Sequence, residues 1–203
     1  MLNTPHTFIF IGRSGSGKGT QAELLKSFLV ASDSRAIQYI QTGQRFRDFI
    51  QSDTYTAELA KKVLDTGALM PEFLGVWNWS SIFVDKVMGD EHMILDGMPR
   101  RLREAHILDS AMEFYGREMP LVIHIDILED TARKRLLGRA REDDVDIEIE
   151  RRLAWFNTDV VPVIENYTRD RKYNFIRIDG ELIEQEIAEN IQTEFKKIYG
   201  YNN

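Results

Sequence analysis

The stretch from Phe8 to Thr20, FIFIGRSGSGKGT, constrains the fold more than any other part of this 203-residue chain. An apolar run leads into Gly12, four further residues and Gly17-Lys18, which is the spacing of a phosphate-binding loop. Glycines at these positions let backbone N–H groups point at a phosphate, and a helix that begins near Lys18 would add its positive end. A flexible Gly/Ser linker is the simpler alternative, but linkers are not framed by a buried strand and an amphipathic helix. The pattern therefore predicts a strand, a phosphate loop and a helix.

The loop departs in one respect from the simplest form of its pattern. Gly19 stands where Ser or Thr usually follows the lysine, and the next hydroxyl belongs to Thr20. A hydroxyl at this point commonly coordinates Mg²⁺ beside the phosphates. We therefore expect Thr20, one residue later than usual, to approach the metal.

The composition predicts an ordinary globular protein and argues against several classes. The formal net charge is -7, which disfavours a general nucleic-acid or membrane-surface binder, because phosphate-rich surfaces attract net basic proteins. The chain has no cysteine, so neither a disulfide nor a cysteine-built zinc site is possible. No segment has the pattern of a signal peptide or of a membrane span. We expect a cytoplasmic monomer without zinc that binds neither nucleic acid nor membrane.

Strands and helices alternate along the chain. This alternation is typical of an α/β protein whose parallel sheet carries helices on both faces. Apolar runs predict strands at residues 7–11, 36–40, 92–95, 121–127 and 175–178. Between the second and third strands, two helices with few apolar positions indicate a small inserted lobe. One long helix is expected at residues 145–169, despite Pro162.

Several arginines stand beside glycines or acids at the ends of elements rather than on continuous helix faces. Arg47, Arg100, Arg139 and Arg141 share this position. A guanidinium group binds phosphate oxygens in a bidentate manner, so this distribution suits phosphate clamps. For Arg103 we expect a solvated helix face.

Asp96 ends the third apolar strand. The carboxyl ends of parallel strands lie near the ligand in such sheets, so Asp96 suits coordination of Mg²⁺ through water better than a simple helix cap. Trp77 and Trp155 fall on apolar helix faces and are expected in the core. No pair of residues suggests a nucleophile with its base.

Four segments resemble a known family. GRSGSGKGTQ from Gly12, QTGQRFR from Gln41, DGMPR from Asp96 and RLLGRAREDD from Arg135 closely resemble the motifs of adenylate kinases, in the family's order and over almost the whole chain. The resemblance implies a P-loop kinase core with a five-stranded parallel sheet, a helical monophosphate-binding lobe and a very short lid. The core would comprise residues 1–41, 72–138 and 147–203, the lobe 42–71 and the lid 139–146.

The resemblance also implies roles for individual residues. Those expected to act on the transferring phosphate are Lys18, Arg100, Arg139, Arg141 and Arg152. Those expected to bind ATP are Gly15, Ser16, Gly17, Lys18, Gly19, Thr20, Arg135, Arg139 and Gly180. Those expected to bind AMP are Thr42, Gly43, Arg47, Gly67, Leu69, Met70, Gly97, Arg100 and Glu104. Asp143 and Asp144 would hold the closed lid. The residues expected near Mg²⁺, through water, are Thr20 and Asp96.

The activity that the resemblance implies is reversible phosphoryl transfer from Mg-ATP to AMP, giving two ADP. The pair Thr42-Gly43 favours AMP, whereas Glu104 stands where adenylate kinases usually have a glutamine that reads the AMP base. A kinase of GMP, CMP or UMP therefore stays open, as does a catalytically silent nucleotide-binding module. Gln44 also replaces the family's usual aspartate, and the lid is shorter than the family's short form.

Overall fold

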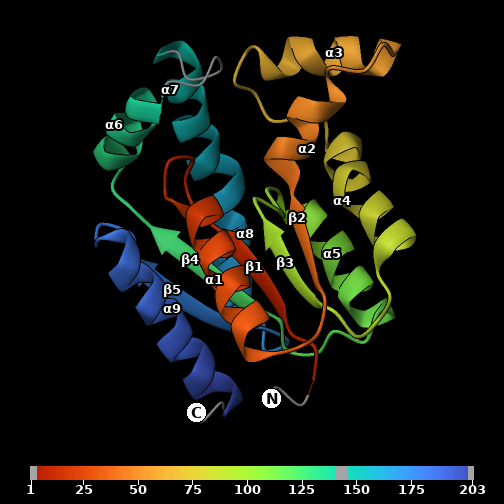
Figure 1. Ribbon diagram of the computed structural model, residues 1–203. Coiled ribbons are helices and arrows are strands. Elements are labelled where there is room, and N and C mark those ends of the chain that lie inside the picture. Colours follow the sequence, from red (N-terminus) through yellow and green to blue (C-terminus); the bar gives the residue numbers. More distant parts are fainter. Residues whose placement is uncertain (1–3, 140–145, 201–203) are drawn as a thin grey trace.

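The computed structural model describes residues 4–139 and 146–200, and its centre is a parallel β-sheet (Figure 1). The strand order is β2-β3-β1-β4-β5, and each neighbouring pair is parallel. The strands are β1 (Thr7–Ile11), β2 (Ile37–Gln41), β3 (His92–Asp96), β4 (Leu121–Asp126) and β5 (Asn174–Asp179). The predicted α/β class with a five-stranded parallel sheet is confirmed.

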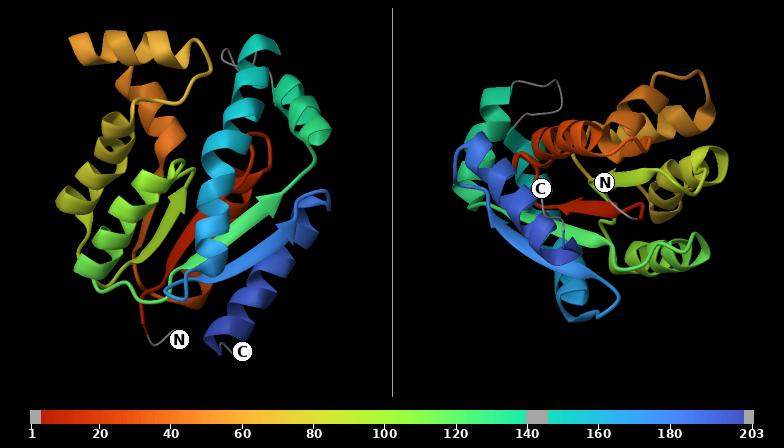
Figure 2. Two further views of the ribbon diagram at one scale, coloured as in Figure 1. Left: turned by 180° about the vertical axis from the view of Figure 1, so that it is seen from behind. Right: turned by 60° about the horizontal axis from the view of Figure 1, so that its bottom comes forward.

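The central strand β1 shows how the sheet is covered on both faces. Phe8 and Phe10 join an apolar cluster on one face, and Ile9 and Ile11 join a cluster on the other. The helices of the two layers are α1 (Lys18–Ser32), α9 (Glu184–Tyr199), α4 (Glu72–Lys86), α5 (Leu102–Phe114) and α8 (Val161–Arg169). The first face packs against α1 and α9, and the second against α4, α5 and α8 (Figure 2). Burial on both faces explains why the predicted strands are continuously apolar.

Two groups of helices stand above the carboxyl ends of the strands (Figure 1). They are α6 (Glu129–Arg139) with α7 (Asp146–Trp155), and α2 (Thr42–Phe49) with α3 (Tyr55–Leu64). Leu136 and Leu153 belong to a small cluster between α6 and α7. Phe46, Ala60 and Met70 belong to a separate cluster. The helices α2 and α3, expected as an inserted lobe, therefore share an apolar cluster separate from the two that cover the sheet.

The helix expected at residues 145–169 contains a π-helical turn. Within its described part, α7 ends at Trp155, a π-helical turn covers Phe156–Val160, and α8 follows. A proline inside an α-helix clashes with the carbonyl four residues earlier, and the wider turn just before Pro162 relieves that clash. Pro162 itself lies in the first turn of α8. The predicted long helix is therefore present over its described residues 146–169, with a π-helical turn inside it that the sequence reading did not foresee.

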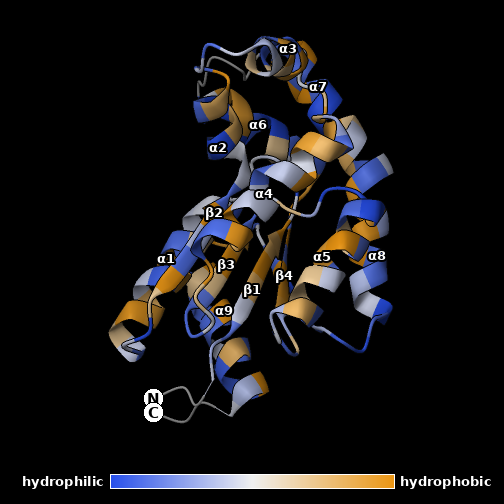
Figure 3. Cartoon of the chain, turned by 90° about the vertical axis from the view of Figure 1, so that its right-hand side faces the viewer, coloured by the Kyte–Doolittle hydropathy of each residue, from blue (hydrophilic) through white to orange (hydrophobic). Residues whose placement is uncertain are grey.

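Hydropathy follows the layers of the fold. The strands β1 and β4 are largely hydrophobic (orange), while the outer helices carry hydrophilic segments (blue) (Figure 3). Trp77 is an exception to the prediction, since it is 40% exposed rather than in the core. Phe73 on the same helix is also exposed, so the sequence of α4 does not single out its buried side. The core tryptophan of this helix is Trp79. Among the described residues, no helix is both long and apolar enough to span a bilayer.

Candidate active site

The loop between β1 and α1 has the backbone that its glycines predict. Gly15 and Gly17 have φ angles of 83° and 86°, a region that L side chains avoid. A Cβ atom at Gly15 would also lie 2.9 Å from the carbonyl oxygen of Ala132 on α6. Because α1 begins at Lys18, its unbonded N–H groups face the loop. The predicted phosphate loop is present, and the helix end supplies positive potential there.

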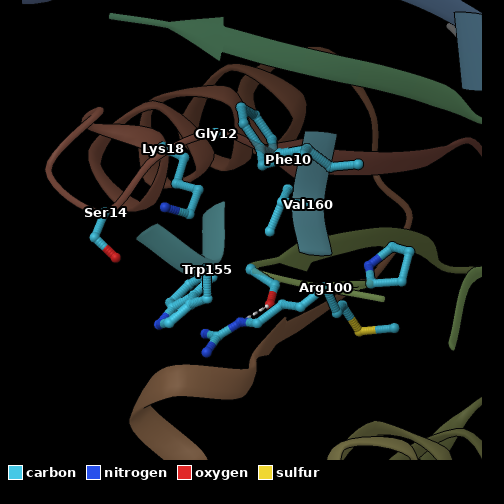
Figure 4. Close-up of a pocket in the computed structure, with 11 residues that line it drawn as sticks. Phe10, Gly12, Ser14, Lys18, Arg100, Trp155 and Val160 are labelled. Atoms are coloured by element: carbon cyan, nitrogen blue, oxygen red, sulfur yellow. Dashed lines mark hydrogen bonds between the residues drawn. The ribbon is translucent and has the colours of Figure 1, made fainter. Parts of the chain in front are cut away.

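Lys18 and Arg100 line one pocket at the carboxyl ends of β1 and β3. The hollow measures about 310 Å³, and Ser14 and Trp155 also line it. Figure 4 shows the Lys18 ammonium and the Arg100 guanidinium on different sides of this hollow, with the Trp155 indole near Arg100. Lys18 Nζ donates a 3.0 Å hydrogen bond to the carbonyl oxygen of Arg13, which holds the ammonium over the loop. Two cations from separate elements make this pocket suitable for a phosphate.

The Asp96 carboxylate lies against the start of α1. It is 5% exposed, and its Oδ2 atom accepts hydrogen bonds from the Tyr39 hydroxyl at 3.2 Å and Gln41 Nε2 at 3.1 Å. A Cβ atom at Gly19 would lie 3.3 Å from the same oxygen. Burial and the Asp96 charge raise the pKa of Tyr39, so its phenol stays a donor. Thr20, in the first turn of α1, is exposed.

Arg47 and Arg100 approach the same backbone position from two elements. A Cβ atom at Gly43 would lie 3.6 Å from Arg47 Nη1 and 3.9 Å from Arg100 Nη2. Arg100 Nε donates to the Gly97 carbonyl oxygen at 2.8 Å. Arg47 Nη2 donates to Gln44 Oε1 at 2.8 Å, so the residue that departs from the family pattern positions a clamp arginine. The structure thus brings together two of the predicted phosphate clamps.

A second hollow of about 320 Å³ adjoins Arg100 on the side of the α2–α3 lobe. The residues that line it are Thr42, Phe46, Leu69, Met70, Gly75, Gly97, Arg100, Arg101 and Glu104. Most of the predicted AMP residues therefore meet in one place. Thr42 Oγ1 donates to the Gly97 carbonyl oxygen at 3.0 Å, which ties α2 to the end of β3.

Glu104 is the carboxylate of this second hollow. It is 7% exposed, which excludes a simple surface acid. Its Oε1 accepts from Trp79 Nε1 at 3.1 Å, and its Oε2 accepts from the backbone N–H of Arg100 at 2.7 Å. Burial raises the pKa of Glu104, although these donors and the charge of Arg100 act in the opposite direction.

Gly67, also expected near AMP, packs against α7. A Cβ atom at Gly67 would lie 2.8 Å from the Cα atom of Glu148, and its φ angle is 67°. The Gly67 carbonyl oxygen accepts from Trp155 Nε1 at 3.1 Å, and Arg151 Nη1 donates to the Thr66 carbonyl oxygen at 2.7 Å. The segment that carries Leu69 and Met70 is therefore fastened to α7. Trp155, expected in the core, packs partly buried against the core cluster, and it also lines the phosphate pocket and holds this segment.

The expected ATP residues surround the other side of the loop. Arg135 Nη2 donates to the Gly180 carbonyl oxygen at 2.9 Å, which joins two of them. Arg139 ends α6 and is exposed, whereas Arg152 on α7 is only 8% exposed. Burial lowers the pKa of Arg100, and the charge of Arg152 acts in the same direction. The remaining expected residues, Arg141, Asp143 and Asp144, lie outside the described residues.

Comparison with known proteins agrees with this geometry. The adenylate kinase family model matches residues 10–172. The chain belongs to the adenylate kinase family. Adenylate kinase 1 of Nostoc sp. is 30% identical over 184 residues, which cover 91% of this chain and 95% of the relative. The adenylate kinase of Bacteroides fragilis is 31% identical over 199 residues, covering 95% and 100%, and that of Leptospira biflexa is 34% identical over 165 residues, covering 78% and 84%.

Membership of the adenylate kinase family makes the chain a nucleoside monophosphate kinase, as the resemblance predicts. The sequence did not lead us to expect a role for Arg13 in holding the phosphate loop. Its Nη2 donates to Asn157 Oδ1 at 3.0 Å, and its guanidinium lies 4.3 Å from the centre of the Phe156 ring. The phosphate loop is therefore tied to the π-helical turn after α7. A charged side chain inside a Gly/Ser-rich loop was the available signal.

Proposed function

We propose that the protein catalyses reversible phosphoryl transfer from Mg-ATP to AMP, giving two ADP. The observation that carries this proposal is the pair of adjoining hollows that share Arg100. One hollow contains Lys18 and the phosphate loop, and the other contains the expected AMP residues. A nucleoside monophosphate in the second would place its phosphate near Arg100, facing the first. The names of the bacterial relatives support AMP as the acceptor.

The residues would act chiefly by position and charge. Phosphoryl transfer needs little covalent chemistry from the protein, because the charge grows on oxygens of the transferring group. Lys18 would neutralise that charge from the loop, and Arg139 and Arg152 would do so from α6 and α7. Arg47 and Arg100 would grip the monophosphate, since both lie beside Gly43.

Magnesium fits the residues at the end of β3. Mg²⁺ keeps several waters and usually takes one or two carboxylates plus phosphate oxygens. The described residues contain no cluster of three or more metal-binding side chains, and Asp96 beside Gly19 suits such indirect coordination. Thr20 follows Gly19 in the first turn of α1 and would approach the ion from there. When bound, the ion would neutralise phosphate charge. Asp96 would hold its waters, and Tyr39 and Gln41 would orient that carboxylate.

We also propose that residues 42–71 form a lobe that moves on a core of residues 1–41, 72–138 and 147–203, and that residues 139–146 form the lid. Of that lid, residues 139 and 146 belong to the part of the chain that the structure describes. The separate apolar cluster formed by α2 and α3 with neighbouring residues supports the first part. Closure would exclude water from the transferring phosphate. We propose further that the protein works in the cytoplasm as a monomer. The absence of cysteine and the net charge of -7 support a reducing compartment and no nucleic-acid partner.

The test is a coupled assay of ADP formation with Mg-ATP and each of AMP, GMP, CMP and UMP. The proposal predicts turnover with AMP above the other three. GMP is the second candidate, because the Glu104 carboxylate can accept from both donors on the guanine edge. A preference for GMP, CMP or UMP would replace the acceptor, and no turnover with any of them would support a silent nucleotide-binding module.

A further inference from the structure

Glu104 places a carboxyl group in a hollow whose walls are partly apolar. Three apolar side chains, Phe46, Leu69 and Met70, line the same hollow. A Cβ atom at Gly75 would lie 3.9 Å from Glu104 Oε1, so the carboxylate reaches the part of the wall that has no side chain. A base bound between the apolar walls would meet this carboxyl group along its hydrogen-bonding edge.

Both carboxylate oxygens already accept one hydrogen bond from the protein. The donors are the Trp79 indole and the Arg100 backbone N–H. Each oxygen keeps further acceptor capacity, so the group can still make a two-point contact with a base. An ionised carboxylate offers two acceptors to that base, whereas a protonated one offers a donor and an acceptor.

The two common purines need different partners at this edge. Adenine presents an amino donor next to a ring nitrogen that accepts, and guanine presents two neighbouring donors. The ionised form of Glu104 therefore matches guanine. Its protonated form matches adenine, in the way that a glutamine amide would. A mismatch leaves a buried polar group unpaired and weakens binding roughly tenfold or more.

We propose that Glu104 selects the base through its protonation state, so that AMP binds with Glu104 protonated and GMP binds with Glu104 ionised. This rests on the proposed function, because it requires the hollow beside Arg100 to receive the base of the acceptor. AMP binding then takes up a proton wherever free Glu104 is ionised, and AMP affinity falls as the pH rises.

The surroundings of Glu104 favour its protonated form. Just before its own helix, the charge of Arg100 and the backbone N–H groups of Arg100 and Arg101 act on Glu104, and Arg101 lines the same hollow. From α8 the facing group is Tyr167, whose pKa burial raises well above its ordinary value, so it stays neutral. From α4 it is the neutral indole of Trp79, and the α2 side chains of the hollow do not titrate. Burial outweighs the arginines and raises the pKa of Glu104, which lowers the cost of protonation near neutral pH.

The first test measures proton uptake by calorimetric titration of the full chain with AMP, at one pH in two buffers of different ionisation enthalpy. Glu104→Gln is the matched control, because the amide keeps an acceptor and cannot titrate. At a pH above the pKa of Glu104, we expect the wild type to take up nearly one proton more per AMP than Glu104→Gln. The titration of the AMP phosphate contributes equally to both proteins. Titration with GMP should show no such excess.

A second test uses the wild type alone and does not depend on a folded variant. The ratio of AMP to GMP affinity should fall about tenfold per pH unit above the pKa of Glu104, because the phosphate titration cancels in the ratio. A ratio that does not change between about pH 6 and about pH 8.5 would overturn the proposal, as would equal proton uptake by wild type and Glu104→Gln. Failure of the proposed function looks different, since neither monophosphate would bind and no ADP would form.

Discussion

The phosphate side and the base side of the site are built in different ways. The hollow around Lys18 has one continuous loop on one side, whose shape follows from the φ angles of Gly15 and Gly17 and from the start of α1. Arg100 and Trp155 complete it from other segments. The hollow around Glu104 combines residues of α2, α4, α5 and the segment that contains Met70. The shape of the phosphate loop is therefore determined locally in the chain, whereas the base side depends throughout on long-range packing.

This difference predicts two kinds of mutant. Changes around the phosphate loop should reduce the chemical step, because they remove charge from the transferring group. Changes around Glu104 and its supports should alter the affinity and choice of the monophosphate. If a change near Glu104 reduced the chemical step alone, or a change in the phosphate loop altered the choice of base, the two sides would not be separable.

Replacing Lys18 should have the largest effect. We expect Lys18→Met to lower kcat on the order of 10²-fold or more while the fold is kept, because the ammonium neutralises charge that develops in transfer. Steady-state kinetics measures kcat, and circular dichroism measures whether the fold is kept. Lys26→Met is the matched control, since Lys26 lies on the same helix in an exposed ion pair with Glu23. Near-normal turnover of Lys18→Met would show that the loop assignment is wrong.

The clamp arginines should separate the two substrates. Arg100→Ala and Arg47→Ala should weaken the monophosphate about 10- to 100-fold, the range for hydrogen bonds to charged groups. Arg139→Ala should mainly affect ATP and kcat. Separate titration of each substrate measures this, with the exposed Arg103→Ala as control. Equal effects of all three variants on both substrates would contradict the division between the sides.

The indole of Trp155 should contribute a smaller amount to the base side. Trp155→Phe keeps a ring beside Arg100 but removes the hydrogen bond to the Gly67 carbonyl oxygen. We expect the KM for AMP to rise about 2- to 10-fold with little change in the KM for ATP, as for the loss of one neutral hydrogen bond. An increase in the ATP KM alone would show that the indole does not act through the segment of Leu69 and Met70.

The contact between Arg13 and Asn157 should have the smallest effect. Arg13→Ala should lower kcat about two- to fivefold, because it loosens the phosphate loop from the π-helical turn without removing charge that faces the substrate. Asn157→Ala should have a similar effect, and the double variant should be no worse than either single one. Additive losses would indicate that the two residues act independently.

Much of the core could be predicted because its signals are local. The apolar run of β1 and the glycine spacing after it fix a strand, a loop and a helix start within a few residues. The start of α2 at Thr42, one residue after β2, was less predictable, since its hydroxyl bonds to Gly97 rather than capping the helix.

Long-range packing decides the features that the local sequence pattern leaves open. Trp77 and Trp79 are two residues apart on a helix with apolar residues on several sides, and only the neighbouring layers determine which one is buried. Glu104 has the local pattern of an exposed helical acid, but Trp79, 25 residues earlier, and the Arg100 backbone enclose it. Trp155 likewise gains its role from Gly67, 88 residues away.

The most direct test of the account compares kcat/KM for AMP and GMP, with saturating Mg-ATP at neutral pH, in wild type and Glu104→Gln. We expect that the wild type favours AMP and that Glu104→Gln widens this preference about tenfold or more, because the amide supplies an N–H donor without taking up a proton from solution. A wild type that favours GMP, with a variant that shifts towards AMP, would contradict AMP as the acceptor and leave the phosphate side intact. Identical ratios in both proteins would contradict base reading by Glu104.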